Sequence, residues 1–171
     1  MRRRWPYNLD PVVLGALAGM AGAVVKFLLE LVVLIFIPSY KSCLRLAGAI
    51  LFDATFTLSH LSALFLGFEI DLIVSSVAGF VAVEILAFSG RDWLLFKGAG
   101  GGALSWVICY ATLCRFLSRI EIINTPFLET QLSLLVHIIF GMVVVRAAVE
   151  IERRWPAREG RKKKATPEGD S

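Results

Sequence analysis

The chain has 171 residues, of which 57% are hydrophobic and only 19% are charged, and its formal net charge is +4. Its mean hydropathy is +0.71, whereas soluble domains usually carry about 25% charged residues, so the composition excludes an ordinary soluble domain. The apolar runs are long and do not alternate with polar residues, which excludes a transmembrane β-barrel. We therefore predict an all-α integral membrane protein.

The first predicted element is a membrane span over residues 11–37, preceded by the basic segment 1–10, "MRRRWPYNLD". A basic start followed by an apolar stretch is also typical of a cleaved signal peptide. The apolar stretch here extends well beyond the roughly 7 to 15 residues of a signal sequence. We therefore predict a retained span.

Two charged residues, Lys26 and Glu30, interrupt this span. Ionisable side chains are costly at membrane depth and mark candidate functional sites. Because the two are four residues apart, they share a helix face, which predicts an ion pair within the span. Lys26 also continues a stripe of glycines at helical spacing, so it is expected to face the interior of a helix bundle. The glycines of this stripe are Gly15, Gly19 and Gly22.

The stretch from 44 to 66 decides the number of spans. Asp53, Thr57 and His60 lie on one face of a helix, which favours an amphipathic or re-entrant segment over about 44–62. The alternative is a fifth span. Lys and Arg collect in cytoplasmic loops, and four spans place the basic N-terminus and the basic tail on the same side. We therefore predict four spans with both termini cytoplasmic, and keep Asp53 and His60 as secondary candidates.

The second span is predicted over residues 67–90. Glu84 is a secondary candidate, expected to pair with Arg91 or Lys97 at the cytoplasmic surface. Near the opposite end, Glu69 and Asp71 are expected to mark the outer interface. None of these residues by itself indicates a function.

The third span, predicted over 95–117, opens with "KGAGGGA" at 97–103. Glycine-rich loops can bind phosphate, but the order of residues here differs from that of a P-loop. Gly98, Gly102, Ser105 and Cys109 repeat the spacing of the stripe in the first span. Stripes of small residues let helices approach closely in lipid, so we favour helix packing.

The fourth span is predicted over 128–149, where Thr130, Ser133, His137 and Gly141 follow similar spacing. His137 lies near its centre, at the depth expected for the two charges of the first span. An imidazole suits a proton relay, and a neutral histidine hydrogen-bonded across helices is the alternative. The predicted midplane polar cluster comprises Lys26, Glu30, His137, Ser105 and Cys109. The predicted helix-packing glycines are Gly15, Gly19, Gly22, Gly98, Gly102 and Gly141.

Residues 151–171 contain "GRKKK" together with prolines and glycines, which predicts a disordered cytoplasmic tail. A basic run beside a membrane indicates contact with anionic lipids, not with nucleic acid. The chain has no HExxH or G-x-S-x-G motif and no metal-ligand spacing. We therefore predict that it is not an enzyme and that it holds no metal and no cofactor.

The run "GRDWLLFKGAGGGALSWVICY", followed by "HIIFGMVV", and the glycine-rich "GALAGMAGAVVK" carry a family resemblance. They resemble multi-pass membrane proteins of Gram-positive bacteria of the YqhR type, whose activity is unassigned. The resemblance implies a four-span protein of the bacterial cytoplasmic membrane. It transfers no catalytic residue.

Two functions from different classes remain open. The first is a structural, assembly or interaction component of the membrane, in which buried charges specify helix pairing, with a second copy or another membrane protein as partner. The second is an oligomeric transporter or channel subunit that uses the cluster of Lys26, Glu30 and His137. Substrate sites of transporters often lie at the midplane.

Overall fold

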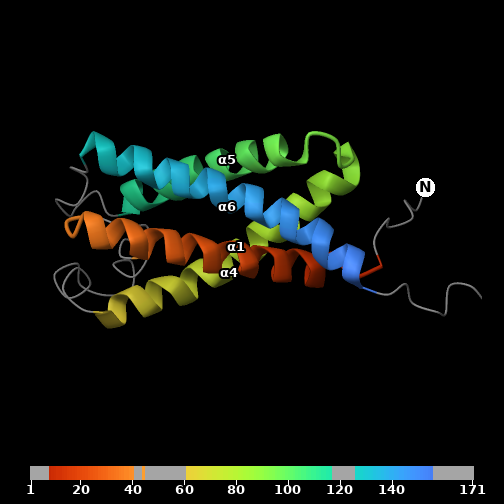
Figure 1. Ribbon diagram of the computed structural model, residues 1–171, viewed down its shortest axis with the longest axis horizontal. Helices are drawn as coiled ribbons and strands as arrows, with labels where there is room; N and C mark the ends of the chain where they lie inside the picture. Colours follow the sequence, from red (N-terminus) through yellow and green to blue (C-terminus); the bar gives the residue numbers. More distant parts are fainter. Residues whose placement is uncertain (1–7, 41–43, 45–60, 117–125, 156–171) are drawn as a thin grey trace, which may run out of the picture.

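The computed structural model describes residues 8–40, 44, 61–116 and 126–155. The described residues form four helices: α1 (Pro11–Phe36), α4 (Leu61–Ser89), α5 (Leu94–Phe116) and α6 (Phe127–Arg154) (Figure 1). The predicted all-α fold is therefore confirmed for this part of the chain. Asp53 and His60, with most of the predicted amphipathic segment, lie outside the described residues.

Three of these helices, α1, α4 and α6, are long and apolar enough to cross a membrane. The apolar part of α5, Leu94–Tyr110, is shorter. Length and composition thus agree with a membrane protein.

Capping residues explain two helix ends. The carboxylate of Asp10 accepts a hydrogen bond from the backbone N–H of Val12 at 2.9 Å, and Pro11 occupies the first helical position, both of which favour a helix start. At the end of α4, Gly90 has a φ of 77°. This left-handed conformation is typical of the residue that terminates a helix, and glycine adopts it without strain.

Two predicted boundaries differ from the structure. The chain is helical from Leu61, six residues before the predicted start of the second span at 67. At the other end of the chain, α6 continues to Arg154, so the first four residues of the predicted disordered tail are helical. Glu150 accepts hydrogen bonds from Arg153 at 2.8 Å and from Arg154 at 2.6 Å, and side-chain pairs at this spacing stabilise a helix.

The helices are arranged in the order α4, α1, α6, α5. Helix α1 lies between α4 and α6 and runs antiparallel to both, and α5 packs along the other side of α6 (Figure 1). Helices α4 and α5 scarcely touch although they are consecutive in sequence. The interfaces α1·α4, α1·α6 and α5·α6, which we call seams, are therefore closely packed. Helices α4 and α5 are separated along most of their length.

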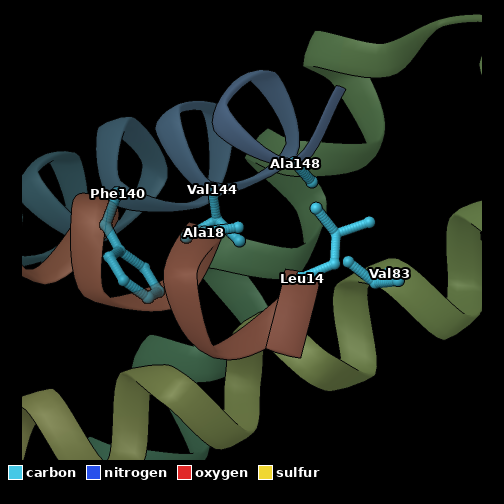
Figure 2. Close-up of a cluster of buried hydrophobic side chains, with 6 residues drawn as sticks. All are labelled: Leu14, Ala18, Val83, Phe140, Val144 and Ala148. Atoms are coloured by element: carbon cyan, nitrogen blue, oxygen red, sulfur yellow. The ribbon is translucent and has the colours of Figure 1, made fainter. Parts of the chain in front are cut away.

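The apolar core lies among α1, α4 and α6 (Figure 2). Its fully or almost fully buried members are Leu14, Ala18, Val83, Phe140, Val144 and Ala148. None of these residues belongs to α5, which is held mainly by α6. The backbone N–H of Asn8 donates to the carboxylate of Glu152, so the start of α1 and the end of α6 lie at the same end of the molecule.

Candidate functional site

The central polar contact is an ion pair between α1 and α4. Nζ of Lys26 lies 2.5 Å from Oδ1 of Asp71, and the two side chains are 5% and 11% exposed. The sequence pattern predicted that Lys26 pairs with Glu30 within its own helix. The ion pair between Lys26 and Asp71 joins two helices that are distant in sequence, so it can fix their register, and the pairing of Lys26 with Glu30 stays a prediction.

Asp71 is the functional candidate that sequence reasoning missed, because it was expected at the outer interface. That prediction assumed a span beginning at residue 67. Since the helix extends back to Leu61, Asp71 lies about 9 Å farther from the start of its helix than expected, at about 1.5 Å of rise per residue. A signal was available: a lysine buried in a span needs an acidic partner, and Asp71 is an acid of the adjacent apolar run.

Glu30 lies one helical turn beyond Lys26, and its side chain is completely buried. A buried carboxylate is costly unless its surroundings compensate it. This position agrees with an inward-facing polar stripe on α1. Lys26 and Glu30 therefore share a face, as their spacing predicts.

His137 is also buried, with 2% of its surface exposed. Its Nδ1 lies 2.8 Å from the carbonyl oxygen of Ser133. Because a carbonyl oxygen can only accept, Nδ1 carries a proton, and in the neutral ring Nε2 is an acceptor. Within the described part of the chain, Nε2 has no hydrogen-bond partner. The hydrogen bond of Nδ1 stays within α6 and does not link two helices.

Residues from the other three helices lie in the region around the Lys26 charge. Its Nζ lies 5.9 Å from the centre of the Phe140 ring, and His137 is close enough to interact electrostatically with it. Cys109 of α5 is close enough to interact with both Lys26 and Asp71. The structure thus brings three members of the predicted cluster, Lys26, Cys109 and His137, around the ion pair.

Ser105 lies apart from this charge layer. Its hydroxyl donates to the carbonyl oxygen of Gly102 at 2.8 Å, and the residue lines a cavity of about 460 Å³ between α4 and α5. Cys109 lines the same cavity, whereas Lys26, Glu30 and His137 do not. The cavity is therefore largely separate from the Lys26–Asp71 ion pair.

The six glycines singled out in the sequence all lie at helix contacts. In α1, Gly15 and Gly19 face the backbone of α4, and Gly22 faces side chains of α6. In α5, Gly98 and Gly102 face the backbone of α6, opposite Gly141. A methyl group at most of these positions would collide with backbone atoms of the neighbouring helix, so glycine sets the helix separation.

The glycine contacts of the α1·α4 seam recur in the α5·α6 seam. Gly79 of α4 packs against Gly15 and Gly19, and Gly141 of α6 packs against Gly98 and Gly102 in the same way. Gly19 meets the carbonyl oxygen of Ser75, and Gly102 meets that of His137. The two helix pairs therefore form a structural repeat.

The sequence supports this repeat. When the seams are aligned on their glycines, identical residues coincide at the pairs Gly15/Gly98, Ala16/Ala99, Gly19/Gly102, Val24/Val107, Leu72/Leu134, Val74/Val136, Gly79/Gly141, Val81/Val143 and Val83/Val145. The same alignment places Asp71 opposite Ser133 and Lys26 opposite Cys109. Ser133 accepts a hydrogen bond from Nε1 of Trp106 at 3.2 Å, so each seam holds one polar link at the corresponding acceptor position.

The remaining candidate, Glu84, is half-buried on α4, and no ion pair joins it to Lys97 in the described part of the chain. Lys97 instead donates to the carbonyl oxygens of Ser89 and Gly90, at 2.9 and 3.0 Å. Those carbonyls lie at the end of α4, where they lack helical partners and attract a cation. Of the two predicted partners of Glu84, Lys97 is therefore engaged elsewhere, and Arg91 stays a prediction.

Among the described residues, no group of three or more His, Cys, Asp or Glu side chains is arranged to hold a metal ion. Comparison with protein-family models, with curated proteins and with solved structures finds no match. The case for function therefore rests on the site alone.

Proposed function

We propose that this chain is a non-enzymatic, multi-pass component of the bacterial cytoplasmic membrane with a structural, assembly or interaction role. The four described helices would form a four-span transmembrane bundle, as the resemblance to the YqhR type also implies. Its partner would be a second copy or another membrane protein. Anionic lipids would contact its basic ends.

The observation that carries the proposal is the buried Lys26–Asp71 ion pair. The pair neutralises two charges across the α1·α4 seam, and neither residue is open to the cavity as a conducting path would require. Buried ionic groups serve in some proteins to specify register and partner at a cost in stability. An ion pair that fixes helix register in this way suits a component that must keep one arrangement of helices.

The distribution of charge supports the proposed orientation. Arg91 and Lys97, in and after the α4–α5 turn, lie at the same end as the start of α1 and the end of α6. In the sequence, Arg2, Arg3 and Arg4 precede α1 and the "GRKKK" run follows α6, outside the described residues. Because Lys and Arg collect on the cytoplasmic side, we propose that both termini are cytoplasmic.

The test replaces the charges singly and together. We expect Lys26→Met or Asp71→Leu alone to reduce the amount of folded protein in membranes, and the double variant to restore it. Arg146→Met, which removes an exposed cation of α6, is the matched control. Proton and ion flux is then measured in vesicles reconstituted with each variant, and we expect no flux above that of empty vesicles.

A second candidate, an oligomeric transporter or channel subunit, is favoured by one specific observation. Nε2 of His137 and Oδ2 of Asp71 are buried and lack hydrogen-bond partners in the described part of the chain. Both belong to the central layer of a repeated helix pair, the place where transporters with internal repeats bind ions. Flux through the native protein, lost in a folded Lys26→Met/Asp71→Leu variant, would establish this candidate and overturn the first.

A further inference from the structure

The cavity between α4 and α5 is a groove with apolar walls and a cation at one end. Its walls come from α4 and α5, and its floor comes from α6. Of the residues that line it, only Lys97, Ser105 and Cys109 have polar side-chain atoms. The Ser105 hydroxyl is occupied by the carbonyl oxygen of Gly102. The groove therefore offers hydrocarbon surface along its length and a positive charge at Lys97.

The repeat explains why the groove exists. In the closed α1·α6 seam, Gly22 packs against Phe140 and Val144. At the corresponding positions of α4 and α5, Ser105, Ala78 and Ala82 all line the groove. Two alanines thus stand where the closed seam has a phenylalanine and a valine. The missing side-chain volume leaves the space open.

The dimensions of the groove suit a single hydrocarbon chain. From Lys97 to Cys109 it follows about 18 Å of α5, at about 1.5 Å per residue, which is close to half of a hydrocarbon core about 30 Å thick. A volume of about 460 Å³ over that length gives a mean cross-section of about 25 Å². A groove this narrow suits a single extended hydrocarbon chain.

The charged end suits an anionic headgroup. The ammonium group of Lys97 has three donors, two of which are used by the carbonyl oxygens of Ser89 and Gly90. No carboxylate in the described part of the chain lies within ion-pair distance of it. Its charge is therefore not neutralised, and one N–H remains for a phosphate oxygen. The N-terminus of α5 adds a positive dipole end nearby.

We propose that this groove binds one acyl chain of a membrane phospholipid, with the phosphate of the headgroup held at Lys97. The lipid belongs to the leaflet on the side of the two termini, and its chain ends near Ile108 and Cys109. This inference rests on the proposed placement in a membrane. It adds a defined lipid site to that proposal.

The first test uses the native chain, so it does not depend on the folding of a variant. Full-length protein is reconstituted with phosphatidylglycerol that carries a photoreactive diazirine at the end of one acyl chain. We expect crosslinks, mapped by mass spectrometry, at Ile73, Ile108 and Cys109, which line the far end of the groove. Crosslinks spread evenly over lipid-facing residues such as Leu28 and Val32 of α1 would overturn the proposal.

The second test fills the groove and measures phosphatidylglycerol bound to delipidated protein by native mass spectrometry. Ala78→Phe/Ala82→Val copies the side chains of the closed seam, and we expect it to weaken binding by about tenfold or more, the effect of losing a few buried methylene contacts. Gly101→Leu should do the same. Gly100→Leu is the matched control, because both glycines have open space around them but only Gly101 lines the groove.

The charged end is tested separately. We expect Lys97→Gln to weaken phosphatidylglycerol binding about tenfold, with Lys97→Arg close to the native protein, while diacylglycerol, which lacks phosphate, binds all three equally weakly. The proposal would be overturned if Gly100→Leu and Gly101→Leu weakened phosphatidylglycerol binding equally. It would also be overturned if Gly101→Leu reduced the amount of dimer and left lipid binding unchanged. Extraction of cell membranes with carbonate separates the two failures: a chain released from membranes refutes the membrane placement, whereas a retained chain without bound lipid refutes only the groove.

Discussion

The α1·α4 and α5·α6 seams have the same glycine framework but different polar links. In both, two glycines of one helix pack on a third glycine of its partner. Beyond the glycines, α1·α4 holds the Lys26–Asp71 ion pair, and α5·α6 holds the neutral Trp106–Ser133 hydrogen bond. Close packing is therefore common to the repeat, and the charge is particular to one copy.

This difference indicates which seam depends on its polar link for a fixed register. A buried ion pair contributes little net stability, because desolvation offsets most of the attraction, but losing one partner is severe. A neutral hydrogen bond between membrane helices contributes less and costs less when broken. The ion pair thus holds the α1·α4 seam to one register, whereas the packing of the α5·α6 seam depends mainly on its glycines.

The largest expected effect comes from breaking the ion pair. Lys26→Met leaves the Asp71 carboxylate buried without its cation, and we expect it to lower the free energy of unfolding by about 3 to 5 kcal/mol. The Lys26→Met/Asp71→Leu variant should unfold with a free energy near or above that of the native protein. Unfolding in mixed detergent micelles measures both. A single variant as stable as the native protein would show that the seam does not depend on the charge pair.

The sequence predicted the helices of this comparison better than their polar contacts. Helices α1, α5 and α6 begin within one residue of the predicted spans, because Asp10, Asp92 and Pro126 precede clear apolar runs. The start of α4 was misplaced, because the polar residues around Leu61 were assigned to a separate amphipathic segment that ended near residue 62. That error moved Asp71 to the interface and hid the ion pair.

The glycine spacing predicted which faces meet but not which helices they join. Gly15 and Gly98 have the same local pattern, and only the structure shows that their partners are Gly79 and Gly141. The groove could not be predicted from the amino-acid sequence alone. It depends on the small volume of Ala78 and Ala82 relative to Phe140 and Val144, and those residues become comparable only after the helix pairs are superposed.

The second prediction tests whether the two glycine frameworks are equivalent. A methyl group at Gly19 would collide with the carbonyl oxygen of Ser75, and one at Gly102 with that of His137. We expect Gly19→Ala and Gly102→Ala each to destabilise the protein by about 1 to 3 kcal/mol, the usual cost of overpacking. Thermal unfolding in detergent measures the changes.

A matched control lies next to Gly102. Gly101 has no atom within 4 Å of the added methyl group, so Gly101→Ala should stabilise the protein by about 0.5 to 1 kcal/mol through helix propensity. If Gly102→Ala were also stabilising, the α5·α6 seam would not be as closely packed as the α1·α4 seam. The equivalence of the two seams would then be lost.

The smallest effect is expected at the neutral link. Ser133→Ala removes the acceptor of the Trp106 indole N–H but leaves the backbone carbonyl of Ser133 in place for His137. Hydrogen bonds between membrane helices average about 0.6 kcal/mol, several times less than the expected loss at Lys26. A double-mutant cycle with Trp106→Phe isolates this energy from the packing of the indole ring. A coupling energy as large as that between Lys26 and Asp71 would mean that both seams are fixed by their polar links, because the neutral link would then match the ionic one.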